Sequence, residues 1–181
     1  MKKYILILIP LMAISLLSCN SKSKQIKVIT EAEKDVYNPN LKSIDIGDAE
    51  FLVGKYIEFA DNYPDDELSP NYLFNAGEIL MNINRGQQAV ETFNRIIKNY
   101  EDFEKLPETY FLSGFTYENI LFNIRQAERT YKTLMEQFPD HELAKEAKYC
   151  IDNIGKSPEE LIQEFEQRAR EDSLAAIIDA R

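Results

Sequence analysis

Residues 70–100 of this chain read PNYLFNAGEILMNINRGQQAVETFNRIIKNY, and residues 107–138 read PETYFLSGFTYENILFNIRQAERTYKTLMEQF. The two stretches share one pattern, because Pro70 and Gly77 recur as Pro107 and Gly114, 37 residues later. Three apolar positions occur three times, at spacings of 37 and then 38 residues: Leu52, Tyr56, Tyr63; Ala89, Phe93, Tyr100; Ala127, Tyr131, Phe138. A fixed period of this length is typical of stacked helix pairs, each of which buries its apolar face on its neighbours. The sequence therefore predicts an all-α solenoid of antiparallel helix pairs.

Small residues at repeated positions indicate where the helices pack most closely. Gly77 and Gly114 are expected to allow a second helix to approach, although glycine in a helix costs about 1 kcal/mol relative to alanine. The extra residue of the second period falls between Gly114 and Ala127, in a predicted turn where insertion costs little. The expected core positions are Leu73, Ala76, Leu80, Tyr110, Ser113 and Tyr117.

Apolar spacing and turn residues predict helices over residues 26–37, 46–62, 70–83, 87–100, 107–121, 125–138 and 141–154. Ser69 and Pro70 read as the N-cap and first turn of one of them. A capping box from Ser157 to Glu160 opens a final helix. We expect its residues Leu161, Ile162, Phe165 and Ala169 to cap the end of the solenoid, and Leu174, Ile177 and Ile178 to hang free or meet a partner.

The N-terminus reads as a targeting segment. Lys2 and Lys3 precede an apolar run that is too short to span a bilayer, and the run stops at Leu16-Leu17-Ser18-Cys19. This ending resembles a bacterial lipobox, which implies removal of residues 1–18 and lipid modification of Cys19. An ordinary secretory signal with a chance cysteine is the alternative. Residues 19–25 are polar and are expected to form a short tether that leads to the repeats of residues 26–156.

Little in the chain points to catalysis. His141 is the only histidine, and Cys150 lies in an apolar helical set as the only thiol besides Cys19, so we expect no zinc site and no redox role. Asp61, Asp65, Asp66 and Glu67 lack the ligand spacing of a calcium loop and read as a solvated helix end. No acid/base pair or cofactor-binding fingerprint is recognisable. The net charge of −10, which becomes −12 if residues 1–18 are removed, disfavours nucleic acid as a partner.

The repeated positions resemble the tetratricopeptide repeat family. Its pattern is met by Leu73-Ala76-Gly77-Leu80-Ala89-Phe93 and by Tyr110-Ser113-Gly114-Tyr117-Ala127-Tyr131-Pro139, while its tryptophan is absent. Repeats that end in Tyr63-Pro64 or Phe138-Pro139 look most like two envelope groups. These are the periplasmic coordinator of the Tol–Pal system (YbgF/CpoB) and the barrel-assembly lipoprotein BamD.

This resemblance implies a non-enzymatic scaffold whose first helices line a concave groove. Carried over to this chain, the groove residues are Phe74, Glu78, Asn82, Phe111, Phe115 and Asn119. Phe111 and Phe115 could equally pack on the preceding helix pair, and the two asparagines could clamp an extended peptide. We therefore expect an envelope protein or peptide in the groove, and a Cys19 lipid in the outer membrane, facing the periplasm. A BamD-like assembly role and a lipoprotein that binds or processes peptidoglycan or another glycan are the alternatives.

Overall fold

The computed structural model describes the backbone of residues 5–39 and 43–179 and the side chains of residues 21–39, 43–157, 159–171 and 173–174. These residues form helices that are joined by turns, and they form no strand. The helices are α1 (Ile5–Val36), α2 (Ile46–Asn62), α3 (Leu68–Asn82), α4 (Gly86–Asn99), α5 (Leu106–Asn119), α6 (Ile124–Gln137), α7 (Glu142–Asn153) and α8 (Pro158–Asp179). The predicted bounds of α2 to α7 agree with these within two residues.

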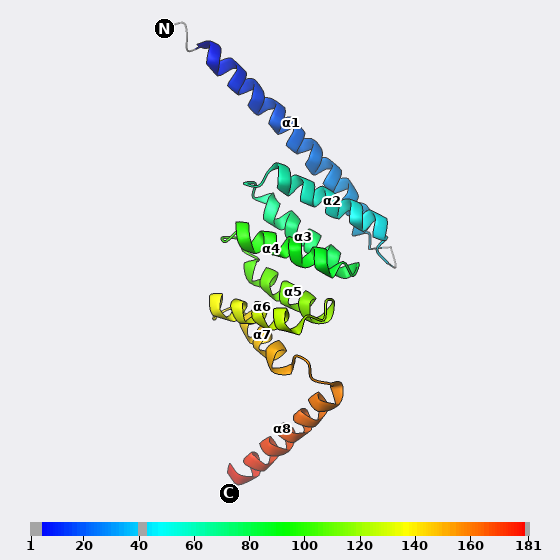
Figure 1. The fold of residues 1–181 in the computed structure, drawn as a ribbon, viewed down its shortest axis with the longest axis vertical. Coiled ribbons are helices and arrows are strands. Elements are labelled where there is room, and N and C mark those ends of the chain that lie inside the picture. Colours follow the sequence, from blue (N-terminus) through cyan, green and yellow to red (C-terminus); the bar gives the residue numbers. More distant parts are fainter. Residues whose placement is uncertain (1–4, 40–42, 180–181) are drawn as a thin grey trace.

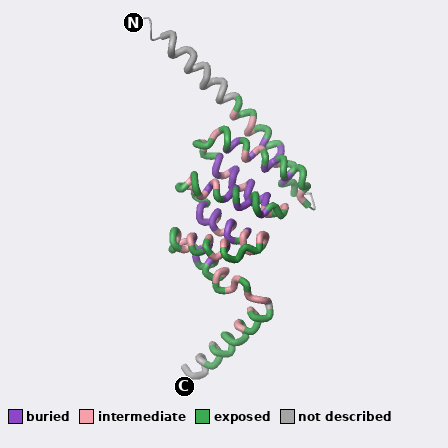
Figure 2. Tube along the Cα trace, in the orientation of Figure 1, coloured by how far each residue is buried: buried purple, intermediate pink, exposed green. Residues whose placement is uncertain are grey.

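Helices α1 to α7 stack into an elongated solenoid, in which each helix packs on the next one along the chain (Figure 1). Helix α3 also contacts α5, and α5 contacts α7, so alternate helices form one layer of the stack. Buried residues run along the centre of this stack (Figure 2). They include the predicted positions Leu73, Ala76, Leu80, Tyr110 and Ser113, while Tyr117 is only partly buried. The all-α solenoid is confirmed.

The two repeat glycines lie where two helices approach most closely. A Cβ added to Gly77 would lie 2.3 Å from Cε1 of Phe93, and one added to Gly114 would lie 2.6 Å from Cε1 of Tyr131. Phe93 and Tyr131 are themselves fully buried repeat positions. Each glycine of α3 or α5 therefore receives the aromatic ring of the following helix, which confirms the predicted close packing.

The extra residue of the longer period lies in a turn, as predicted. Residues 83–85 connect α3 to α4, whereas residues 120–123 connect α5 to α6. Both turns contain a residue in the left-handed region, Asn84 at φ 60° and Phe122 at φ 51°. Asparagine tolerates this conformation better than phenylalanine does. The insertion thus leaves the packed faces in register and places an aromatic ring, 79% exposed, at the turn.

Three helix starts can be compared with their predicted caps. The capping box is confirmed: the Ser157 N–H donates to Glu160 Oε2 at 2.7 Å, and the Glu160 N–H donates to Ser157 Oγ at 3.2 Å. His141 lies at the N-cap of α7, where its Nδ1 accepts from the Leu143 N–H at 3.3 Å. The prediction for Ser69 was wrong, because α3 begins at Leu68 and the buried Ser69 hydroxyl donates instead to the Tyr63 carbonyl at 2.6 Å.

The expected tether is part of helix α1. Residues 21–25 continue the helix that carries Ile29, Ala32 and Val36 into the core, and Lys22 forms an ion pair with Asp66. The polar residues extend the helix because each added residue gains a backbone hydrogen bond once a helix exists. The side chain of Cys19 and those of the predicted signal segment lie outside the described residues. Among the helices that the structure describes, none is long and apolar enough to cross a membrane.

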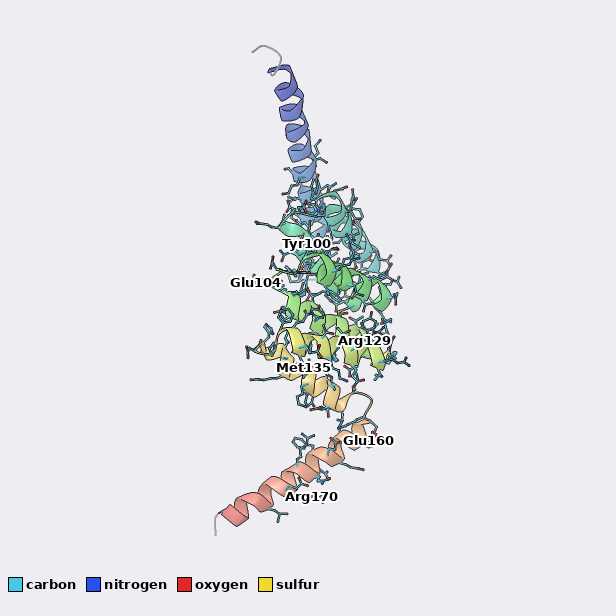
Figure 3. The ribbon with its side chains drawn as sticks, turned by 60° about the vertical axis from the view of Figure 1, so that its left-hand side comes forward. Tyr100, Glu104, Arg129, Met135, Glu160 and Arg170 are labelled. Atoms are coloured by element: carbon cyan, nitrogen blue, oxygen red, sulfur yellow. The ribbon has the colours of Figure 1, made fainter. Side chains whose placement is uncertain are left out.

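Helix α8 does not cap the solenoid, contrary to the prediction. It projects away from the stack, with Ile162 59% exposed and Phe165 75% exposed (Figure 1). Glu160 and Arg170 mark its course away from the other helices (Figure 3). The physical reason is that α7 already closes the stack. It buries Ala144 and Ala147, and its exposed side carries polar residues: Lys145, Glu146, Lys148, Tyr149 and Asp152.

Candidate protein-binding groove

The predicted groove residues come from α3 and α5, which lie in the same layer of the stack. Offsets of four place each set of three along one side of its helix. The structure leaves Glu78, Asn82, Phe115 and Asn119 exposed, whereas Phe111 is half-buried and Phe74 is buried. Four of the six predicted groove residues are therefore exposed, and the other two are not.

Phe74 is a core residue, which corrects its assignment to the groove. It is only 5% exposed, and its ring centroid lies 6.3 Å from that of Phe93 and 6.1 Å from that of Phe103. The Lys105 Nζ lies 4.9 Å from the centroid of the same ring. Phe103 and Lys105 belong to the turn between α4 and α5, and this turn covers Phe74. No pattern within α3 itself could reveal that cover.

The two phenylalanines of α5 behave differently. The Phe111 ring lies 5.7 Å from the Tyr131 ring, so Phe111 packs against the following helix. Phe115, one turn further along α5, is 40% exposed. Of the two aromatic candidates in α5, Phe115 is thus the one that offers a large accessible ring.

The asparagines differ in what their amides can offer a peptide. Asn119 Nδ2 donates to the Phe115 carbonyl at 3.2 Å, so its amide donor already serves the last turn of its own helix. Asn82 lies at the corresponding place in α3 and is exposed. A peptide clamp at Asn119 would have to replace this local hydrogen bond.

Tyr37 extends this surface and is absent from the sequence-derived set. It follows the end of α1 and is 54% exposed. Desolvation raises the pKa of its phenol, and the nearby Glu78 carboxylate acts in the same direction. Desolvation by neighbouring groups also raises the pKa of Glu78, although its side chain is exposed, and the Lys105 ammonium acts in opposition. The available signal was the repeat itself, since Tyr37 precedes Phe74 by 37 residues, although Tyr37 lies just after the end of α1 whereas Phe74 lies within α3.

Two carboxylates behind this surface have fixed structural partners. The Tyr56 hydroxyl donates to Glu33 Oε1 at 2.8 Å, and the Tyr131 hydroxyl donates to Glu118 Oε2 at 2.9 Å. Burial is the main cause that raises the pKa of both phenols well above the usual range of tyrosine. Tyr56 and Tyr131 are fully buried and their carboxylate partners are only partly exposed, so Glu78 is the exposed carboxylate of this surface.

A concave region lies where the turn after α2 meets the turn after α4. It is a cleft of about 570 Å³, and its lining includes Asp65, Asp66, Glu67, Glu101, Asp102 and Glu104. Figure 3 places Tyr100 and Glu104 on this edge of the stack. Asp66 pairs with Lys22, and Asp61 pairs with Arg95 at 2.5 Å. Within the described ranges, no group of three or more His, Cys, Asp or Glu side chains could hold a metal ion.

Cys150 is half-buried in α7 and packs against the core. Burial raises the pKa of its thiol, which disfavours the reactive thiolate. This environment agrees with the structural role expected from its apolar neighbours in the sequence.

Comparison with known protein families identifies a match. The tetratricopeptide repeat model matches residues 72–102 and 108–141, which correspond to the helix pairs α3–α4 and α5–α6. The match supports the interpretation of the chain as a tetratricopeptide-repeat protein, and such repeats typically form scaffolds for protein–protein interaction. A comparison with curated proteins gives no match.

Proposed function

We propose that this chain is a non-enzymatic, lipid-anchored scaffold of the bacterial cell envelope that binds a protein partner in the groove of α3 and α5. The observation that carries the proposal is the exposed aromatic and acidic surface of Tyr37, Glu78 and Phe115 on a tetratricopeptide stack. Exposed aromatic rings and a carboxylate on one surface suit an extended segment with apolar and basic side chains.

The cellular location of the protein is proposed from its N-terminal sequence. The run Leu16-Leu17-Ser18-Cys19 supports lipidation of Cys19. Asn20 is not the aspartate that retains lipoproteins in the inner membrane, and residues 20–25 contain no acidic run of the kind that resembles a surface-export signal. These features favour the outer membrane and an orientation toward the periplasm.

The groove is tested by capture of the native partner with the Phe115→Ala variant after crosslinking in the envelope. Loss of an exposed anchor ring should weaken capture by roughly tenfold or more, equivalent to about 1–3 kcal/mol. The melting temperature should change little, because the ring is already 40% exposed. The matched control is Phe122→Ala, which removes an exposed ring from the turn between α5 and α6 and should capture the partner normally.

The same experiment separates the proposal from its alternatives. Capture of a β-barrel assembly complex would favour the BamD-like role, and enrichment of glycan without protein would favour the glycan-binding class. Unchanged capture by Phe115→Ala would place the binding surface elsewhere. Lipidation is tested by palmitate labelling, which the Cys19→Ser variant should lose; equal labelling of that variant would refute the anchor.

A further inference from the structure

The end of the solenoid nearest Cys19 is rigidly joined to the position of the anchor. Helix α1 runs without interruption from Ile5 to Val36, and its residues Ile26 and Ile29 pack into the core. The ion pair between Lys22 and Asp66 fixes the same segment to the turn after α2. At 1.5 Å per residue, Lys22 lies about 5 Å along the helix from Cys19. A lipid on Cys19 would therefore hold the α1–α2 end of the stack against the bilayer.

Two surfaces of opposite charge flank this end. One is the turn edge, where the cleft of about 570 Å³ is lined by six carboxylates and no lysine or arginine. The other, here termed the α1–α2 face, consists of Lys24, Lys27, Val28, Phe51 and Lys55. Residues 21–30 contain three lysines and no acidic residue, in a chain of net charge −10. An anionic surface would therefore attract the lysines of residues 21–30 and repel the turn edge.

The α1–α2 face combines these lysines with exposed apolar side chains. Val28 is 44% exposed and Phe51 is 53% exposed, and both line a cleft of about 310 Å³. Val28 also lines a neighbouring cleft of about 220 Å³ with Lys24 and Lys55. The Lys55 Nζ lies 5.6 Å from the centroid of the Phe51 ring. The Lys55 Nζ is paired with Glu58 Oε2 at 2.7 Å, and Glu58 lines the smaller cleft as well. Among the described residues, Lys24 and Lys27 form no ion pair, so both are available to an external anion.

We propose that the α1–α2 face rests on an anionic phospholipid surface, with Phe51 and Val28 at the headgroup boundary and Lys24 and Lys27 among the phosphates. This inference rests on the lipid anchor of the proposed function. Apolar side chains flanked by lysines are the pattern of interfacial membrane contact. Glu31, Asp35 and Asp48 surround the far part of the larger cleft, so the contact is confined to the part nearest Cys19. The contact fixes the orientation of the whole stack above the bilayer.

The test uses tryptophan fluorescence, because the chain contains no tryptophan. The full-length acylated Phe51→Trp variant is reconstituted into vesicles that contain brominated phosphatidylglycerol. Its emission should be quenched and shifted to the blue. The matched control is Tyr149→Trp, an exposed aromatic position on α7 at the other end of the stack, and it should not be quenched.

Charge reversal tests the electrostatic part of the contact. In the Phe51→Trp background, Lys24→Glu and Lys27→Glu should each shift the equilibrium away from the docked state by at least about fivefold, since one lysine contributes about 1 kcal/mol near an anionic bilayer. Lys98→Glu, the same charge change on α4, should have no effect. Brominated phosphatidylcholine alone should give little quenching.

Distinct results would overturn the docking proposal and the anchor. Equal quenching of Phe51→Trp and Tyr149→Trp, or no quenching of Phe51→Trp in a protein that carries palmitate, would exclude docking while leaving the anchor intact. Quenching that survives both lysine reversals would exclude the electrostatic recognition. A blue shift of Phe51→Trp before vesicles are added would show that a second copy of the chain covers the face, and would also overturn the proposal. Absence of palmitate on Cys19 would instead overturn the proposed anchor.

Discussion

At the scale of single residues, the hydroxyl of each fully buried repeat tyrosine has a carboxylate partner, although the two partners lie at different positions of the repeat. Tyr56 and Tyr131 are fully buried, and their hydroxyls donate to Glu33 and Glu118 respectively. The central unit has Phe93 in place of the tyrosine, and the position 37 residues before Glu118 is Met81. A tyrosine therefore occurs with a carboxylate, and a phenylalanine occurs with an apolar residue. This correspondence follows from the cost of leaving a desolvated polar group without a partner.

The Tyr131→Phe variant tests this correspondence. Loss of the hydroxyl leaves Glu118 without its donor and should reduce the free energy of unfolding by about 1.5–3 kcal/mol, the usual value of a hydrogen bond to a charged group. Urea denaturation measures the change. The double variant Tyr131→Phe/Glu118→Met recreates the pairing of Phe93 and Met81 and should recover most of the loss. A double variant that is less stable than the single one would contradict the explanation.

At the scale of the helix, glycine has opposite consequences in α2 and α3. Gly77 in α3 faces the Phe93 ring at contact distance, whereas a Cβ added to Gly54 in α2 would meet no atom within 4 Å. Both lie in helix interiors, where glycine is less favourable than alanine. Only the packing of the neighbouring helix distinguishes them.

The pair Gly77→Ala and Gly54→Ala makes the distinction measurable, because the chemical change is the same. Gly54→Ala should raise the free energy of unfolding by about 0.5–1 kcal/mol, through helix propensity alone. Gly77→Ala should lower it by about 1–3 kcal/mol, because the added methyl group forces a buried ring to move. Thermal melts of the two variants should shift in opposite directions. A Gly77→Ala protein as stable as wild type would refute the assigned packing of α3 on α4.

At the scale of the whole molecule, buried tyrosines link the stability of the stack to alkaline pH. Burial is the first cause that raises the pKa of Tyr56, Tyr72, Tyr110 and Tyr131 in the folded state. Below about pH 10 the phenols are protonated in both states, so pH has no effect through them. Above about pH 10 the unfolded chain releases protons that the folded chain retains, and the free energy of unfolding falls.

Denaturation at increasing pH should therefore show a steady loss of stability that begins near pH 10, at about 1.4 kcal/mol per pH unit for each such tyrosine. The double variant Tyr131→Phe/Glu118→Met lacks one of these groups and should lose stability with a shallower slope. The exposed Tyr149 provides the control, since Tyr149→Phe should leave the slope unchanged. Identical slopes in the double variant and the wild type would show that Tyr131 does not carry this effect.

The sequence by itself determined helices α2 to α7, their pairing and the close approach of helices at Gly77 and Gly114, while the rings that fill these two sites, Phe93 and Tyr131, were shown by the structure. It could do so because these contacts repeat at a fixed distance along the chain, and the spacing within each helix sets which side is buried. The family resemblance, together with helical register, also pointed to Glu78, Asn82, Phe115 and Asn119, which the structure leaves exposed.

Only the tertiary structure decided which neighbouring segments cover each side of a helix. The turn after α4 buries Phe74, the end of α1 brings Tyr37 beside Glu78, and α7 closes the stack so that α8 is left projecting from it. The rigid junction of α1 likewise depends on an ion pair between Lys22 and Asp66, which are distant in sequence. These outcomes depend on which surfaces meet in space, because the exposure of a side chain is set by its neighbours as well as by its own position in a helix.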